Sequence, residues 1–123
     1  MIDTVKKKIL LIEDDTHVRE IIKDILESEN HEVVAAENGR AALDALEAME
    51  MVPNLILADL MMPIMDGLKF REAQLKNPKF APINFVLMTA ATSFKVSKEH
   101  GTFVFVSKPI KMEDLLRIID ENL

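Results

Sequence analysis

The most informative segment of the chain is Leu55-Ile56-Leu57-Ala58-Asp59-Leu60-Met61-Met62-Pro63-Ile64-Met65-Asp66-Gly67. Four apolar residues lead directly into a carboxylate, and a proline and an Asp-Gly pair then close a loop. A short apolar run with such boundaries is typical of a buried strand. Asp59 therefore stands at the carboxyl end of that strand, the edge where open α/β sheets build their sites. An isolated aspartate there is more often a helix cap or a solvated loop acid, so the remaining chain has to decide its role.

Composition bounds the class of protein. The chain has 123 residues, of which 49% are hydrophobic, which suits a single domain with one core. The net charge is −6, so we expect no binding to nucleic acid or to an anionic membrane, since both need a cationic surface. There is no cysteine and no apolar run as long as a membrane span. We expect a cytoplasmic protein with a flexible lead-in at residues 1–7 and no output domain in this chain.

Apolar runs alternate with amphipathic segments along the chain. Buried strands are expected at residues 9–12, 33–36, 55–58, 83–88 and 103–106. The first helix is expected from a cap at Thr16 or Asp15 to about Leu26. The others are expected at residues 39–49, 68–77, 94–100 and 112–123, the last one capped near Lys111. The third helix has no clean apolar face, and the fourth is weak and short. Strands that are apolar throughout indicate a parallel sheet covered on both faces. The expected fold is a flavodoxin-like, doubly wound α/β domain with five strands in the order 2-1-3-4-5.

Polar residues follow four of these strands. Glu13 and Asp14 come after the first strand, Asp59 ends the third, Thr89 ends the fourth and Lys108 follows the fifth. Neighbouring strands lie about 4.8 Å apart, so the expected order brings these side chains to one small edge. Three carboxylates would repel one another there, and a divalent cation such as Mg²⁺ would resolve the repulsion. Lysine and threonine could hold an anion such as a phosphoryl group.

Together these motifs make the chain similar to the receiver domain of two-component response regulators, the CheY-like family. They are 9-ILLIEDD-15, Asp59 to Gly67, Met88-Thr89-Ala90 and Ser107-Lys108-Pro109. Each is weak alone, but all of them in order, each at a strand exit and spanning nearly the whole chain, are highly specific.

The resemblance implies a role for each matching residue. Asp59 would accept a phosphoryl group from a sensor histidine kinase or a histidine phosphotransfer protein. Asp14 and the backbone carbonyl of Met61 would bind Mg²⁺ directly, with Glu13 acting through water. Lys108 would pair with Asp59 at rest and with the phosphoryl oxygens afterwards. Thr89 and Phe105 match the family's switch pair, although alternating Phe and Val residues in a strand are more often core, and Pro109 matches a proline often preceded by a cis peptide bond.

The implied protein is a signalling switch rather than an enzyme, and its only chemistry is its own phosphorylation and slow dephosphorylation. Its downstream protein target is unknown. Apolar Met61 and Ala91 flank the site and cannot orient an attacking water, so we expect slow loss of the phosphoryl group. His17, His31 and His100 have no spacing typical of metal ligands.

Three alternatives belong to other classes. A haloacid-dehalogenase-type phosphatase needs an Asp-x-Asp pair after its first strand, where this chain has Glu13-Asp14-Asp15. A flavodoxin-like flavin or nucleotide carrier would need a phosphate loop rich in Gly, Ser or Thr at that place. A pseudo-receiver that acts only as a scaffold is the serious rival, but it would normally lack Asp59, Asp14 or Lys108.

Overall fold

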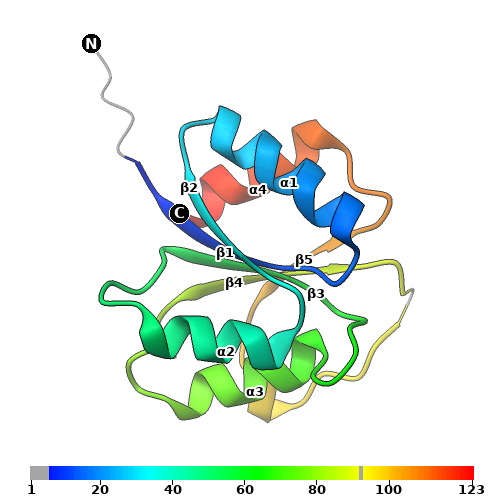
Figure 1. The fold of residues 1–123 in the computed structure, drawn as a ribbon. Helices are drawn as coiled ribbons and strands as arrows, with labels where there is room; N and C mark the ends of the chain where they lie inside the picture. The colour runs from blue at the N-terminus through cyan, green and yellow to red at the C-terminus, as the bar shows by residue number, and fades with distance from the viewer. Residues whose placement is uncertain (1–5, 92) are drawn as a thin grey trace.

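The five strands form one parallel sheet in the order β2-β1-β3-β4-β5, as the sequence predicted (Figure 1). The fold is described from a computed structural model covering residues 6–91 and 93–123. Its elements in chain order are β1 (Lys8–Ile12), α1 (Thr16–Ser28), β2 (Glu32–Ala36), α2 (Gly39–Ala48), β3 (Leu55–Asp59), α3 (Gly67–Lys76), β4 (Asn84–Thr89), the 3₁₀ turn η1 (Lys98–His100), β5 (Val104–Ser107) and α4 (Met112–Asn122).

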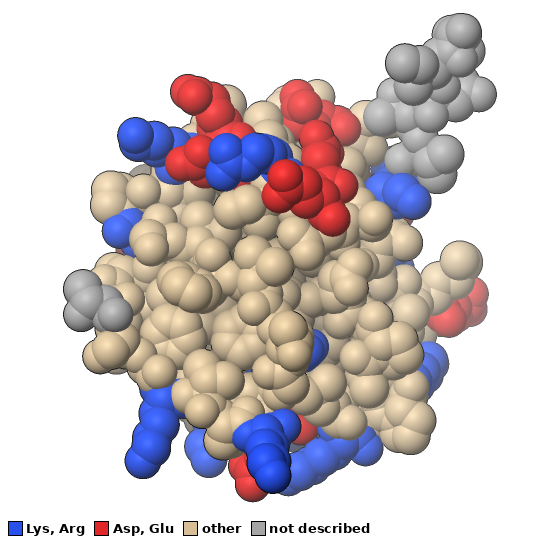
Figure 2. Space-filling model, turned by 180° about the vertical axis from the view of Figure 1, so that it is seen from behind, with Lys and Arg blue, Asp and Glu red and all other residues tan. Residues whose placement is uncertain are grey.

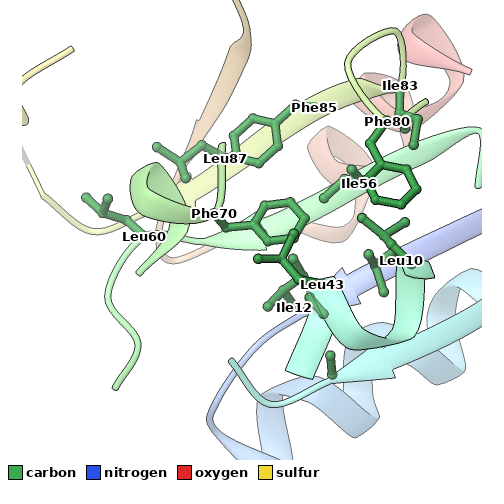
Figure 3. Close-up of a cluster of buried hydrophobic side chains, with 14 residues drawn as sticks. Leu10, Ile12, Leu43, Ile56, Leu60, Phe70, Phe80, Ile83, Phe85 and Leu87 are labelled. Atoms are coloured by element: carbon green, nitrogen blue, oxygen red, sulfur yellow. The ribbon is translucent and has the colours of Figure 1, made fainter. Parts of the chain in front are cut away.

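Both faces of the sheet are buried. α1 and α4 cover one face, and α2 and α3 cover the other (Figure 1). Successive residues of a strand point to opposite faces, so β1 contributes Leu10 and Ile12 to one apolar cluster and Ile9 and Leu11 to another. Figure 3 shows the cluster beneath α2 and α3. The strands β1, β3 and β4 therefore have long apolar runs because each side of the sheet has its own core.

Acceptor side chains begin the first three helices. Asp15, Asn38 and Asp66 each accept a hydrogen bond from the backbone amide three residues later, at 3.0, 2.8 and 2.8 Å. The cap of α1 is thus Asp15 and not Thr16, because the carboxylate one position earlier reaches the free amide of Val18. Of the expected lead-in, residues 1–5 lie outside the described residues. The Lys7 carbonyl accepts a hydrogen bond from the Glu32 amide (2.8 Å), so pairing with β2 begins one residue before β1.

The buried face of α3 is partly polar. Gln74 is fully buried and donates to the backbone carbonyls of Phe80 and Ile83 at 3.0 and 2.9 Å. Arg71 is 6% exposed, and its guanidinium lies 5.0 Å from the centre of the Phe85 ring. These two residues interrupt the apolar pattern, which explains why the sequence showed no clean apolar face for this helix.

The expected fourth helix at residues 94–100 is wrong. The described residues between β4 and β5 contain only the 3₁₀ turn η1, so four α-helices accompany the five strands where we expected five helical segments. α3 holds this segment through side chains: Arg71 donates to the carbonyls of His100 (2.9 Å) and Thr102 (3.0 Å). Glu72 also contacts the His100 ring at 2.9 Å. Side-chain bonds from α3 therefore satisfy two backbone carbonyls of this segment.

Candidate functional site

Three carboxylates meet at the carboxyl edge of the sheet. Glu13 and Asp14 follow β1, and Asp59 is the last residue of β3, the strand that pairs with β1. One oxygen from each carboxylate lies within 4.8 Å of the others. This confirms that the strand order brings the predicted acidic residues together. Hard oxygen ligands in this number suit a small divalent cation that keeps part of its water shell.

The two neighbouring acids after β1 have different surroundings. Glu13 is 1% exposed, and its Oε2 accepts a hydrogen bond from the Asp15 amide at 3.2 Å, while its Oε1 contacts Lys108. Asp14 is exposed to solvent. Both oxygens of Glu13 therefore already have partners within the protein, whereas Asp14 is free to meet an incoming ion.

Lys108 follows the edge strand β5 and reaches the acidic residues at the ends of β1 and β3. Its Nζ lies 2.9 Å from Asp59 Oδ1 and 3.2 Å from Glu13 Oε1. The Lys108 amide donates to the Thr89 carbonyl at 2.8 Å, so the lysine backbone continues the pairing of β4 and β5. The peptide bond between Lys108 and Pro109 is cis, as the resemblance implied. The expected pairing of this lysine with Asp59 is present in the structure.

Burial and neighbouring charges both change the pKa values of the site, and burial is the larger cause at Glu13. Burial raises the pKa of Glu13 to about 7; the Asp15 amide hydrogen bond and the Lys108 charge oppose this rise, and the Asp59 charge adds to it. Burial works against the charged form of Lys108, but the hydrogen bonds and charges of Asp59 and Glu13 outweigh it and raise the pKa of the lysine. The charged form of Lys108 is therefore stabilised at this edge. A second positive charge nearby would lower the pKa of Glu13.

The two expected switch residues occupy different environments. Thr89 ends β4 and is 1% exposed, and its Oγ1 accepts a hydrogen bond from the Ala91 amide at 2.9 Å. Phe105 is 54% exposed, and its ring packs edge to face against Phe94 with the centroids 5.5 Å apart. Phe105 is therefore not a core residue, and its role as a switch stays a prediction.

Two residues that the sequence analysis did not assign to the site support it. The Gly67 amide donates to the Leu60 carbonyl at 2.9 Å, and a Cβ at Gly67 would lie 2.4 Å from the Asp59 carbonyl oxygen. Arg19 Nη1 donates to the Glu13 carbonyl oxygen at 2.8 Å. The Asp-Gly pair was the available signal for Gly67, whereas the contact of Arg19 depends on how α1 leaves the sheet. Met61 has a 73% exposed side chain, and the role of its carbonyl stays a prediction.

The histidines take no part in this cluster. Glu13, Asp14 and Asp59 form the one group of possible metal-binding side chains found among the described residues. His100 instead contacts Glu72, and its Nδ1 accepts a hydrogen bond from the Ser97 amide at 2.9 Å. This is a structural role, in line with the absence of ligand spacing.

The fold and the site are those of a known family. A family model described as the response regulator receiver domain matches residues 9–120, and the chain belongs to this family. The chain is 30% identical to the DNA-binding response regulator MtrA of Mycobacterium tuberculosis over 98% of this chain and 52% of MtrA. Chemotaxis protein CheY4 of Vibrio cholerae superposes with a TM-score of 0.86 at 25% identity, covering 97% of this chain and 100% of that one.

The receiver domain of the Pseudomonas aeruginosa sensor kinase PA1611 has the same fold, with a TM-score of 0.82 at 23% identity over 96% of this chain and 98% of that one. That structure has a magnesium ion in its active-site cleft. The chain spans between about a quarter and about a half of the curated relatives that it matches first. It is therefore the receiver domain of a two-component response regulator.

Proposed function

We propose that Asp59 accepts a phosphoryl group from a phosphohistidine on a sensor histidine kinase or a histidine phosphotransfer protein. A carboxylate oxygen of Asp59 bonds to phosphorus while the phosphorus–nitrogen bond of phosphohistidine breaks, and the imidazole leaves and regains a proton from solvent. The product is an aspartyl phosphate. The observation that carries this proposal is the ammonium of Lys108, 2.9 Å from Asp59 and 3.2 Å from Glu13, beside the exposed Asp14.

The donor set fits Mg²⁺. All three side chains offer carboxylate oxygens, and these lie within 4.8 Å of one another, which suits a small divalent cation. Asp14 and Asp59 would bind the ion directly, with the Met61 carbonyl, and Glu13 would act through water. When bound, Mg²⁺ would neutralise charge on the phosphoryl oxygens. The magnesium reported for the PA1611 receiver supports this choice of ion.

This chain's own residues complete the chemistry. The Lys108 ammonium contacts Asp59 and Glu13 at the same time. It would exchange Asp59 for a phosphoryl oxygen and keep its contact with Glu13. The Thr89 hydroxyl, whose oxygen accepts from the Ala91 amide, would donate its proton to a phosphoryl oxygen. That new bond would draw Thr89 toward the phosphoryl group and shift the segment after β4, where Phe94 packs on Phe105. We therefore propose a signalling switch, with its only chemistry at Asp59 and an exposed protein-binding surface around Phe105.

Membranes and nucleic acids are not among the partners that we propose for this domain. No helix among the described residues is long and apolar enough to cross a membrane. On the face in Figure 2, lysine and arginine are divided between the upper and lower margins, with no continuous basic surface. From the net charge of −6 we propose that this domain does not itself bind nucleic acid. MtrA is named as DNA-binding, and the chain spans about half of it. A cytoplasmic location is proposed with the same function.

Intact mass spectrometry tests the proposal. The protein is incubated with acetyl phosphate and Mg²⁺, beside Asp59→Asn and beside a sample with EDTA. We expect one phosphoryl adduct that needs Mg²⁺ and is absent from the variant. A folded protein that binds Mg²⁺ but forms no adduct would favour the pseudo-receiver, a scaffold whose interactions do not depend on phosphorylation.

A further inference from the structure

Arg19 reaches back from α1 to the acidic end of β1. Its Nη1 donates to the Glu13 carbonyl oxygen at 2.8 Å and lies 3.4 Å from the Asp14 carbonyl oxygen. One nitrogen thus contacts the carbonyls of two consecutive residues whose side chains belong to the acidic cluster. The side chain is half-buried, so the contact is partly shielded from competing water.

These contacts restrain a very short connection. Only residues 13–15 separate β1 from α1, and Glu13 and Asp15 have hydrogen-bond partners besides Arg19. The Glu13 amide donates to the Ala36 carbonyl (3.0 Å), and Asp15 caps the helix. Arg19 adds the restraint on the carbonyls. With its carbonyl held toward α1, the backbone at Asp14 keeps its exposed carboxylate within reach of Asp59.

The hydrogen bonds of Arg19 would favour cation binding, whereas its positive charge would oppose it. A guanidinium close to a cation site repels the cation, so an arginine that acted only through charge would weaken metal binding. A residue that orients the ligands strengthens it, and removing such an outer partner typically weakens metal binding. The two roles therefore predict opposite changes in affinity when the side chain is removed.

We propose that Arg19 is a positioning residue for the cation site: it holds the backbone of Glu13 and Asp14 so that both carboxylates face Asp59. The proposal rests on the proposed function for the identity of the ion, Mg²⁺. It assigns no contact between Arg19 and the ion or the phosphoryl group.

Calorimetric titration of Mg²⁺ into the intact chain tests the proposal without any phosphorylation. Arg19→Ala should bind Mg²⁺ about tenfold more weakly than wild type. Arg19→Lys should recover most of the loss, because one ammonium can take the place of the single nitrogen that makes both contacts. Lys23→Ala is the matched control, since it removes the same charge from α1 one turn further from the site, and it should keep wild-type affinity. Urea unfolding of each variant ensures that all titrations are made on folded protein.

The outcomes separate this proposal from the proposed function. Wild-type or tighter Mg²⁺ binding by Arg19→Ala would overturn the positioning role, as would equal weakening in Lys23→Ala or the absence of Mg²⁺ binding by wild type. Weaker binding by Arg19→Ala, together with no phosphoryl adduct at Asp59 in wild type, would support Arg19 as a positioning residue and refute the phosphoacceptor.

Discussion

Replacing Glu13 by glutamine should remove a large part of the pH dependence of stability in the metal-free protein. Burial raises the pKa of Glu13 from 4.5 to about 7, so the folded chain holds its proton more tightly than the unfolded chain. Between these values the folded state binds more protons, and the free energy of unfolding therefore falls as pH rises. Glutamine resembles the protonated acid in size and cannot ionise, so it lacks this loss.

The size of the effect follows from the two pKa values. Linkage predicts that wild type loses about 2–3 kcal/mol relative to Glu13→Gln between pH 5 and pH 8. In urea this corresponds to a relative shift of the unfolding midpoint by about 1.5 M for a domain of this size. Measurements would be made in EDTA at several pH values. Adding Mg²⁺ at pH 8 should restore part of the loss in wild type, because the cation offsets the ionised cluster.

Parallel midpoints for wild type and Glu13→Gln across this pH range would refute the reasoning. Asp14→Asn is the control, since it removes an exposed carboxylate of the same cluster. A change of equal size in that variant would mean that the total charge of the cluster, and not the burial of Glu13, determines the effect.

Four further substitutions test other contacts. Gly67→Ala should lower the free energy of unfolding by about 2 kcal/mol in urea and slow phosphorylation by acetyl phosphate, because the new Cβ would meet the Asp59 carbonyl; wild-type values would contradict the close approach. Arg71→Met should lower the free energy of unfolding by about 2–3 kcal/mol and speed hydrogen exchange at residues 97–103, because the carbonyls of His100 and Thr102 lose their donor. Unchanged exchange would show that other contacts hold the segment. Ile64 has φ = 70° and is 83% exposed. Because asparagine adopts this conformation with less strain, Ile64→Asn should raise the free energy of unfolding in urea by about 1 kcal/mol. A lower free energy of unfolding would disprove strain there. Met61→Asn should speed the decay of the phosphoryl adduct, which mass spectrometry can follow. An unchanged decay rate would refute the idea that the apolar side chain of Met61 slows hydrolysis.

Much of the fold and site could be predicted from local patterns. The apolar strands, their alternation with helices and the rule of right-handed crossovers led to the observed strand order. That order alone brings Asp59 next to Glu13 and Asp14 and places Lys108 two strands away, because all of them follow parallel strands. The metal and phosphoryl chemistry of the edge could then be argued from residue types.

The errors lie where contacts are long-range. The segment before β5 has only a 3₁₀ turn where a helix was expected, and it is held by Arg71, about thirty residues earlier in the chain, which bonds two of its carbonyls and packs on Phe85. No periodicity reveals such a bond. Phe105 alternates with valines like a core residue, yet β5 is an edge strand of which only Val106 is buried.

Local patterns along the chain specify which residues reach the carboxyl edge of the sheet, because apolar periodicity and turn residues show where each strand ends. How each residue is used at that edge depends on the contacts made by the folded chain. Glu13 and Asp14 are adjacent acids, yet one is buried against Lys108 and the other faces solvent. Burial, and with it the pKa and the freedom to bind an ion, depends on the neighbours that folding brings from distant parts of the chain.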